Sequence, residues 1–127
     1  MSVDEVKVIN ISDNFLVQWD LISDGTIVAF TDSQFELLDS SVVKSVFDND
    51  DAIGFVFSDI EVKENNLLFI EHVGSESLPN IPFFAKKLPL QLQQQALGVN
   101  FSYIMSQFMN KGARFEHVAE PCFRFNK

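Results

Sequence analysis

The chain has 127 residues, of which 46% are hydrophobic, and its formal net charge is −9. The length favours a single domain over residues 1–127, and the apolar content disfavours disorder. The acidic charge disfavours nucleic acid as a partner, because affinity for nucleic acid rests on Lys and Arg neutralising phosphates.

The first half of the chain alternates between strand and helix patterns. Residues 6–11 are rich in Val and Ile and predict a short buried strand. Apolar residues recur at helical spacing over residues 14–23 and 40–47, which predicts two amphipathic helices. Residues 26–31 and 53–57 predict two further strands, and the continuous apolar run at residues 27–30 is typical of a strand covered on both faces. This alternation favours right-handed crossovers and a mainly parallel sheet.

The pattern changes after residue 57. Residues 60–63 and 67–72 predict a hairpin that turns at residues 64–66, and residues 74–82 predict a loop because they contain Ser, Asn and two prolines. The expected fold class is therefore α/β, with a small, mainly parallel sheet, flanking helices and a short antiparallel hairpin.

The last third predicts two helices and two closing strands. Residues 90–97 form a Gln-rich helix pattern, and Asn100 is a suitable N-cap for a second helix through residue 110. Residues 114–118 and 122–125 predict short strands. The hairpin and these strands would also suit an α+β or barrel-like fold, and the strand order distinguishes the alternatives.

The sequence carries no sign of export or of membrane insertion. Its one cysteine, Cys122, excludes an internal disulfide, and residues 1–5 lack the basic and apolar regions of a secretory signal. No apolar run approaches the roughly 18 residues that cross a bilayer. We therefore expect a cytoplasmic protein without a membrane span.

Three segments carry a family resemblance. Residues 25–33, Gly-Thr-Ile-Val-Ala-Phe-Thr-Asp-Ser, place an aspartate directly after an apolar strand. This resembles the strand that delivers the Asp-x-Asp motif in family-2-like glycosyltransferases of the GT-A fold. Residues 53–59 resemble the next strand of that family, and residues 115–121 its closing stretch with a His and then a Glu. The resemblance implies a nucleotide-diphospho-sugar-transferase fold, a nucleotide-sugar partner and Mg²⁺ or Mn²⁺ as cofactor.

The same comparison shows departures from the family's catalytic pattern. The family's first strand–helix unit has no counterpart, so the chain resembles a family member truncated at the N-terminus. The Asp-x-Asp position reads Asp32-Ser33-Gln34, and an amide is a weaker ligand for these cations than a carboxylate. Residues 98–101 offer no carboxylate as a general base. We therefore expect a catalytically degenerate relative that keeps weak nucleotide-sugar or divalent-cation binding.

Four residues are the candidates for such a site. Asp32 follows the end of a buried strand, where open α/β sheets bind ligands, and the resemblance makes it a metal and nucleotide ligand. Glu36 is a candidate to replace the missing second carboxylate. Asp59 also follows an apolar strand and would approach Asp32 if the strands were neighbours. The alternative is that these aspartates cap ordinary turns.

The fourth candidate is His117, which resembles the late His that some GT-A enzymes use as a metal ligand. The alternative is a structural histidine, and His72 is a weaker candidate still. Cys122 has apolar and aromatic neighbours, where a thiol is usually inert. The chain has no Gly-rich phosphate loop, no zinc-type Cys/His cluster and no nucleophile elbow, which argues against a P-loop NTPase, a zinc module and an α/β-hydrolase.

A second hypothesis involves no small-molecule chemistry. Without the family's first unit, the sheet would keep an uncovered edge or face, and such surfaces are generally covered or paired. The alternative function is therefore a non-catalytic interaction or assembly subunit that forms a homo-oligomer or binds a protein partner.

Overall fold

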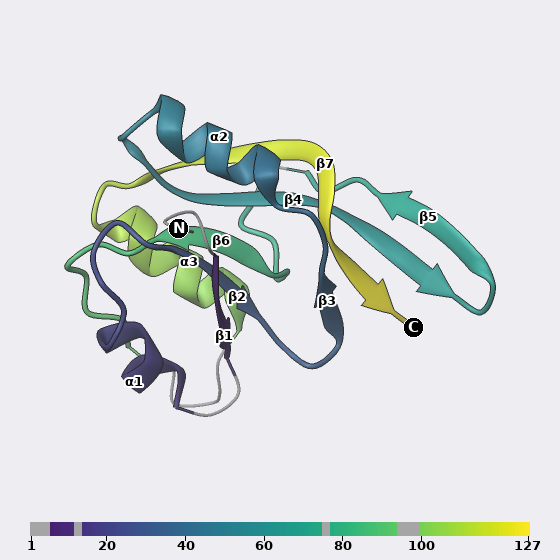
Figure 1. Ribbon diagram of the computed structural model, residues 1–127, viewed down its shortest axis with the longest axis horizontal. Coiled ribbons are helices and arrows are strands. Elements are labelled where there is room, and N and C mark those ends of the chain that lie inside the picture. Colours follow the sequence, from purple (N-terminus) through teal and green to yellow (C-terminus); the bar gives the residue numbers. More distant parts are fainter. Residues whose placement is uncertain (1–5, 12–13, 75–76, 94–99) are drawn as a thin grey trace.

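The computed structural model describes residues 6–11, 14–74, 77–93 and 100–127 (Figure 1). The helices in these residues are α1 (Phe15–Asp20), α2 (Ser41–Asn49) and α3 (Phe101–Asn110). The strands are β1 (Lys7–Asn10), β2 (Ile27–Thr31), β3 (Phe35–Leu37), β4 (Ile53–Glu64), β5 (Leu67–Glu71), β6 (Phe83–Lys86) and β7 (Arg114–Asn126). All the strands form one sheet in the order β1-β2-β6-β4-β7-β3, and β5 pairs with β4.

The sheet is mixed, so the predicted mainly parallel α/β fold is wrong. Strand β1 is parallel to β2 and β4 is parallel to β7, but every other pair of neighbours is antiparallel. The decisive element is β6, which the sequence interpretation assigned to no element. It runs antiparallel between β2 and β4 and separates two strands that the α/β interpretation would make parallel neighbours.

Strand β2 illustrates why the sequence pattern misled. Its residues from Val28 to Phe30 are fully buried, as the continuous apolar run predicts. However, β2 has one parallel neighbour, β1, and one antiparallel neighbour, β6. A central strand covered on both faces needs apolar residues whatever the direction of its neighbours. The GT-A, nucleotide-diphospho-sugar-transferase-like fold is therefore not the fold of this chain.

Helices cover both faces of the sheet, α2 on one side and α1 with α3 on the other (Figure 1). On the α1–α3 face, Trp19 is fully buried and its ring lies 5.6 Å from that of Phe30 and 5.7 Å from that of Phe108. Its indole Nε1 donates to the carbonyl of Leu90 at 2.8 Å. Most of the phenylalanines are also buried in the core, where each ring removes a large apolar area from water.

Several local predictions are confirmed. The helices predicted over residues 14–23 and 40–47 correspond to α1 and α2, although α1 is shorter than expected. The hairpin forms with residues 65 and 66 as its loop, since Glu64 pairs with Leu67. Asn100 caps α3 by accepting a hydrogen bond from the backbone N–H of Tyr103 at 2.7 Å.

Other boundaries differ from the predictions. Residues 53–57 and 60–63 belong to one strand, β4, and residues 114–118 and 122–125 belong to one strand, β7. In the predicted helix over residues 90–97, residues 90–93 are irregular and the rest lies outside the described residues.

The long pair β4–β7 contains an irregularity at the place where its two strands were predicted to end. The register between the strands shifts between Ser58 and Ile60, next to Pro121, which has no N–H to donate to a ladder. The hydroxyl of Ser58 substitutes for a backbone acceptor here, because it accepts from the Cys122 N–H at 3.0 Å. This irregularity positions Asp59.

Candidate functional site

A buried carboxylate, Asp59, lies at this irregularity and is only 1% exposed. One of its oxygens, Oδ2, accepts from Nδ1 of His72 at 2.7 Å. The other, Oδ1, accepts from Nε2 of His117 at 2.7 Å and from the Val73 N–H at 3.0 Å. A buried carboxylate needs such donors, since an unpaired charge in a protein interior is strongly destabilising. We call Asp59, His72 and His117 the His–Asp–His cluster.

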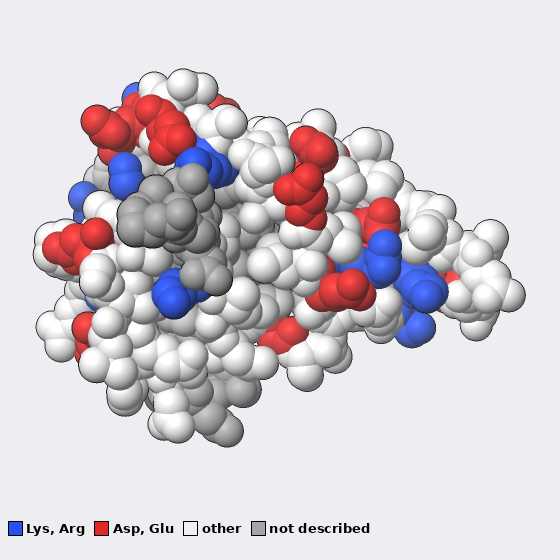
Figure 2. Space-filling model, in the orientation of Figure 1, with Lys and Arg blue, Asp and Glu red and all other residues white. Residues whose placement is uncertain are grey.

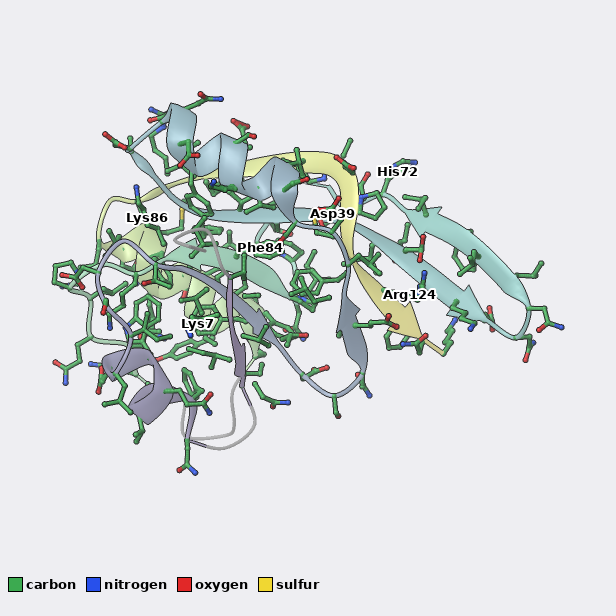
Figure 3. All side chains as sticks on the ribbon, viewed as in Figure 1. Lys7, Asp39, His72, Phe84, Lys86 and Arg124 are labelled. Carbon is green, nitrogen blue, oxygen red and sulfur yellow. The ribbon has the colours of Figure 1, made fainter. Side chains whose placement is uncertain are left out.

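The two imidazoles of the cluster have different environments. The His117 side chain is 29% exposed and its ring centre lies 5.2 Å from that of Phe57, its neighbour across the β4–β7 ladder. The His72 side chain is 82% exposed and follows the end of β5 (Figure 3). The cluster therefore connects the end of the hairpin to strands β4 and β7.

The hydrogen bonds decide the ionisation of Asp59. Burial alone would raise the pKa of this carboxyl, but the donors Val73, His72 and His117 outweigh burial and hold the pKa below its usual value of 3.8. Asp59 is therefore ionised at neutral pH and acts as an acceptor towards all three donors.

The cluster has the groups of a general acid–base system, but none of the hydrogen bonds of its side chains in the described residues is to a hydroxyl or a thiol. The Ser58 hydroxyl is buried and already donates to the Asp59 carbonyl at 2.9 Å. Burial raises the pKa of the Cys122 thiol to about 11, so it is protonated at neutral pH. Each imidazole is hydrogen-bonded to a different oxygen of Asp59, so the carboxylate links the two rings. No group of three or more His, Cys, Asp or Glu in the described part of the chain is arranged to hold a metal ion.

Asp32 lies in a different place from the cluster. Its Oδ1 accepts from the Gln34 N–H at 2.9 Å, which is the turn-capping arrangement of the alternative prediction. It lines a pocket of about 260 Å³, and we call this cavity the Asp32 pocket. The lining residues are Asp32, Gln34, Phe35, Ile60, Glu71, Val73, Asn80, Ile81, Phe101 and Phe125.

The structure brings Asp59 and His117 together but does not bring Asp32 to them. The Asp32 pocket includes Ile60, Glu71 and Val73, which are sequence neighbours of Asp59 and His72, but no member of the cluster. Successive side chains of extended chain point to opposite sides, which explains this separation. Metal binding at Asp32 and His117, and a nucleotide-sugar partner, stay predictions.

Glu36 belongs to a row of charges across β3, β7 and β4. It lies opposite Arg124, which lies opposite Glu61. The Arg124 guanidinium contacts both carboxylates, and its Nη1 is 3.7 Å from Oε1 of Glu36 (Figure 3). The observed partner of Glu36 is therefore this arginine, and cofactor binding by Glu36 or Asp59 stays a prediction.

The sequence interpretation underestimated His72, although the sequence contained the necessary signal. A two-residue loop at residues 65 and 66 pairs Glu64 with Leu67, and continuing that register places Asp59 opposite His72. The predicted turn at residues 64–66 was one residue longer than the observed loop and would have placed Asp59 opposite Glu71, so the prediction missed this carboxylate–imidazole pair.

The sequence interpretation also missed the exposure of β5. All five residues of this strand are exposed, and the first four are large and apolar. Within the described residues β5 pairs only with β4, so its other edge is open. The unbroken run Leu-Leu-Phe-Ile after a turn was the available signal, but it is equally typical of a buried strand.

Comparison of the chain with protein-family models, with curated proteins and with solved structures found no match. Together with the mixed sheet, this overturns the resemblance to family-2-like glycosyltransferases. None of the described helices has the length and apolar character needed to span a membrane.

Proposed function

We propose that this chain is an assembly protein without chemistry of its own, and that two copies associate through the open edge of β5. The exposure of β5 carries this proposal. Leu67, Leu68, Phe69 and Ile70 are 68%, 57%, 45% and 40% exposed. Together they expose on the order of 400 Å² of apolar surface, divided between the two faces of the strand, and this area is comparable to that of the largest apolar patch of an ordinary monomer.

The backbone edge of β5 is also open to pairing with another strand. Native proteins protect an edge strand with charge, proline or a bulge, and β5 carries only Glu71 at its last position. Alternate residues of a hairpin strand direct their N–H and C=O groups away from the partner strand. With Glu64 and Leu67 as the closing pair, the outward groups belong to Leu68 and Ile70.

A second copy fits this edge by symmetry. Antiparallel pairing of β5 with β5 of another copy is isologous, so it closes as a dimer. In a register centred on Phe69, Leu68 of each copy lies opposite Ile70 of the other. Phe69 then extends an apolar row that already runs from Val62 to Phe125 across β4 and β7.

The local charges do not oppose this arrangement. Figure 2 shows Lys and Arg interleaved with Asp and Glu along the projecting hairpin, and an uncharged surface at its tip. The basic residues here include Arg124 and Lys127, which lie within 4 Å of carboxylates of Glu61 and Glu64. In the Phe69-centred register the two Glu71 residues are about 14 Å apart, beyond the screening length at physiological salt.

The expected affinity is modest. If all of this surface on both copies were covered, pairing would bury on the order of 800 Å² of apolar surface in total, an upper limit that lies below the usual 1,200–2,000 Å² of stable specific interfaces. We therefore expect a dissociation constant in the micromolar range or weaker. Raising the salt concentration should strengthen the dimer, because each copy carries a net charge of −9.

Sedimentation velocity over a concentration series tests the proposal. The wild-type mass should rise from 14.4 kDa at low micromolar concentration towards twice that value at several hundred micromolar. Leu68→Lys and Ile70→Lys should remain monomeric, because a lysine on the edge opposes strand addition. Leu21→Lys is the matched control, since Leu21 is 81% exposed and lies after α1, far along the chain from β5; it should associate as the wild type does.

Three results would count against the proposal. A wild type that stays monomeric at several hundred micromolar would exclude self-association. Equal association of Leu68→Lys and the wild type would place the interface elsewhere. Growth beyond the dimer would contradict the closed, symmetric pairing.

A further inference from the structure

We infer that the Asp32 pocket is a binding site for a small organic cation, a primary amine carried on an apolar or aromatic body. This site is separate from the edge of β5 and goes beyond the proposed assembly function. At about 260 Å³ the pocket can enclose a compound of this size.

Apolar side chains form the walls of the pocket. Phe35 stands between two other aromatic residues, with its ring centre 6.3 Å from that of Phe101 and 5.2 Å from that of Phe125. Ile60, Val73 and Ile81 complete the apolar lining. Aromatic faces attract cations as well as apolar groups, so these walls suit a ligand that has both.

The polar residues of the pocket set the sign of the ligand's charge. Asp32 and Glu71 contribute carboxylates, Gln34 and Asn80 contribute amides, and the lining contains no Lys, Arg or His. An ammonium group would therefore find two charges of opposite sign and no like charge in the pocket. An anionic ligand would meet two like charges.

The beginning of α3 does not reverse this preference. A helix N-terminus attracts anions when its backbone N–H groups are free. Here the Phe101 N–H donates to Oδ1 of Asn80 at 2.9 Å, and the Tyr103 N–H donates to Oδ1 of Asn100 at 2.7 Å. The side chains of the chain itself have therefore taken two of the donors that an anion would use.

Titration with phenethylamine, followed by amide chemical shifts in ¹H–¹⁵N NMR spectra, tests the inference. Shifts should concentrate at Gln34, Val73 and Asn80 and should saturate at millimolar amine. The neutral isostere 2-phenylethanol should bind at least about fivefold more weakly, since it keeps the ring and loses the charge. The titration is run on Leu68→Lys, so that association through β5 does not affect the result.

Matched variants identify the carboxylates involved. Glu71→Gln and Asp32→Asn should each weaken amine binding about three- to tenfold and leave binding of the alcohol unchanged. Asn at position 32 keeps the oxygen that caps Gln34, so the turn is preserved. Glu116→Gln removes an exposed carboxylate outside the pocket and should have no effect. Equal affinity for amine and alcohol, no effect of Glu71→Gln, or no saturable shifts at these residues would overturn the inference.

Discussion

Replacing Asp59 by Asn should destabilise the chain by about 2 kcal/mol at pH 7. The change keeps the size and one oxygen of the side chain but removes its charge. Hydrogen bonds to charged groups contribute about 1.5–3 kcal/mol each, against about 0.5–1.5 kcal/mol for neutral pairs. The charged bonds from His72 and His117 would each lose about 1 kcal/mol, whereas the Val73 N–H keeps an acceptor. Asp59→Ala removes every acceptor and should cost about 3–5 kcal/mol.

Urea unfolding followed by the fluorescence of Trp19 measures this effect. Trp19 is the only tryptophan of the chain and is fully buried, so its emission reports the loss of the core. Asp48→Asn is the matched control, because Asp48 is exposed on α2 and the same change there should stay within about 0.5 kcal/mol.

The dependence on pH gives a second, independent check. The pKa of Asp59 is lowered by folding, so the stability that its ionisation contributes is complete above the unfolded value of 3.8. That contribution is lost as the pH falls through the folded pKa. The difference between wild type and Asp59→Asn should therefore shrink as the pH falls below about 3.8. A difference below about 0.5 kcal/mol at pH 7, or one that does not shrink in acid, would refute the reasoning.

Three further substitutions test the packing. A Cβ on Gly54 would lie 2.6 Å from Cβ of Ala113, so Gly54→Ala should cost about 1–3 kcal/mol in urea unfolding, and adding Ala113→Gly should restore part of the loss. Gly25 has a φ of +88° and open space around it, so Gly25→Ala should cost about 1–2 kcal/mol through backbone strain alone, and Gly25→Asn less. Lys87 donates to the Trp19 carbonyl at 2.7 Å and lies 4.2 Å from the centre of its ring, so Lys87→Met should cost about 1–2 kcal/mol and shift the Trp19 emission. If the urea concentration at the midpoint of unfolding did not change for one of the three substitutions, the contact or strain stated for that residue would be contradicted.

Local elements of this fold were predictable because their signals lie within a few residues of one another. The capping Asn100 and the apolar periodicity after it specify α3, and the turn at Asn65 with its φ of +57° specifies the hairpin. The strand order was not predictable, because it depends on contacts between distant residues. Strand β6 has only four residues, and its place between β2 and β4 is set by pairing with Ile27–Phe30 and Phe55–Val56.

The candidate site was predictable to the same extent. Asp59 and His117 were named from the sequence, and the hairpin register could have added His72. Their hydrogen bonds to one carboxylate depend on the parallel pairing of β4 with β7, whose contacts here join residues 58 positions apart. The position of Asp32 in a separate pocket depends on β3, a three-residue strand too short for a periodic signal.

Strands β4 and β7 continue from the helix-covered core into the projecting hairpin, and their pairing extends from Ile53 to Lys63 with a register shift between Ser58 and Ile60. The hairpin is therefore held by the same two strands that cross the core. Along β4, no separate hinge segment lies between the core and the hairpin. A partner that pulled on β5 along the strand direction would share its force among all these pairs at once. Strand β5, in contrast, pairs only with β4 within the described residues, so its amides should exchange with solvent in local openings that leave the β4–β7 ladder intact.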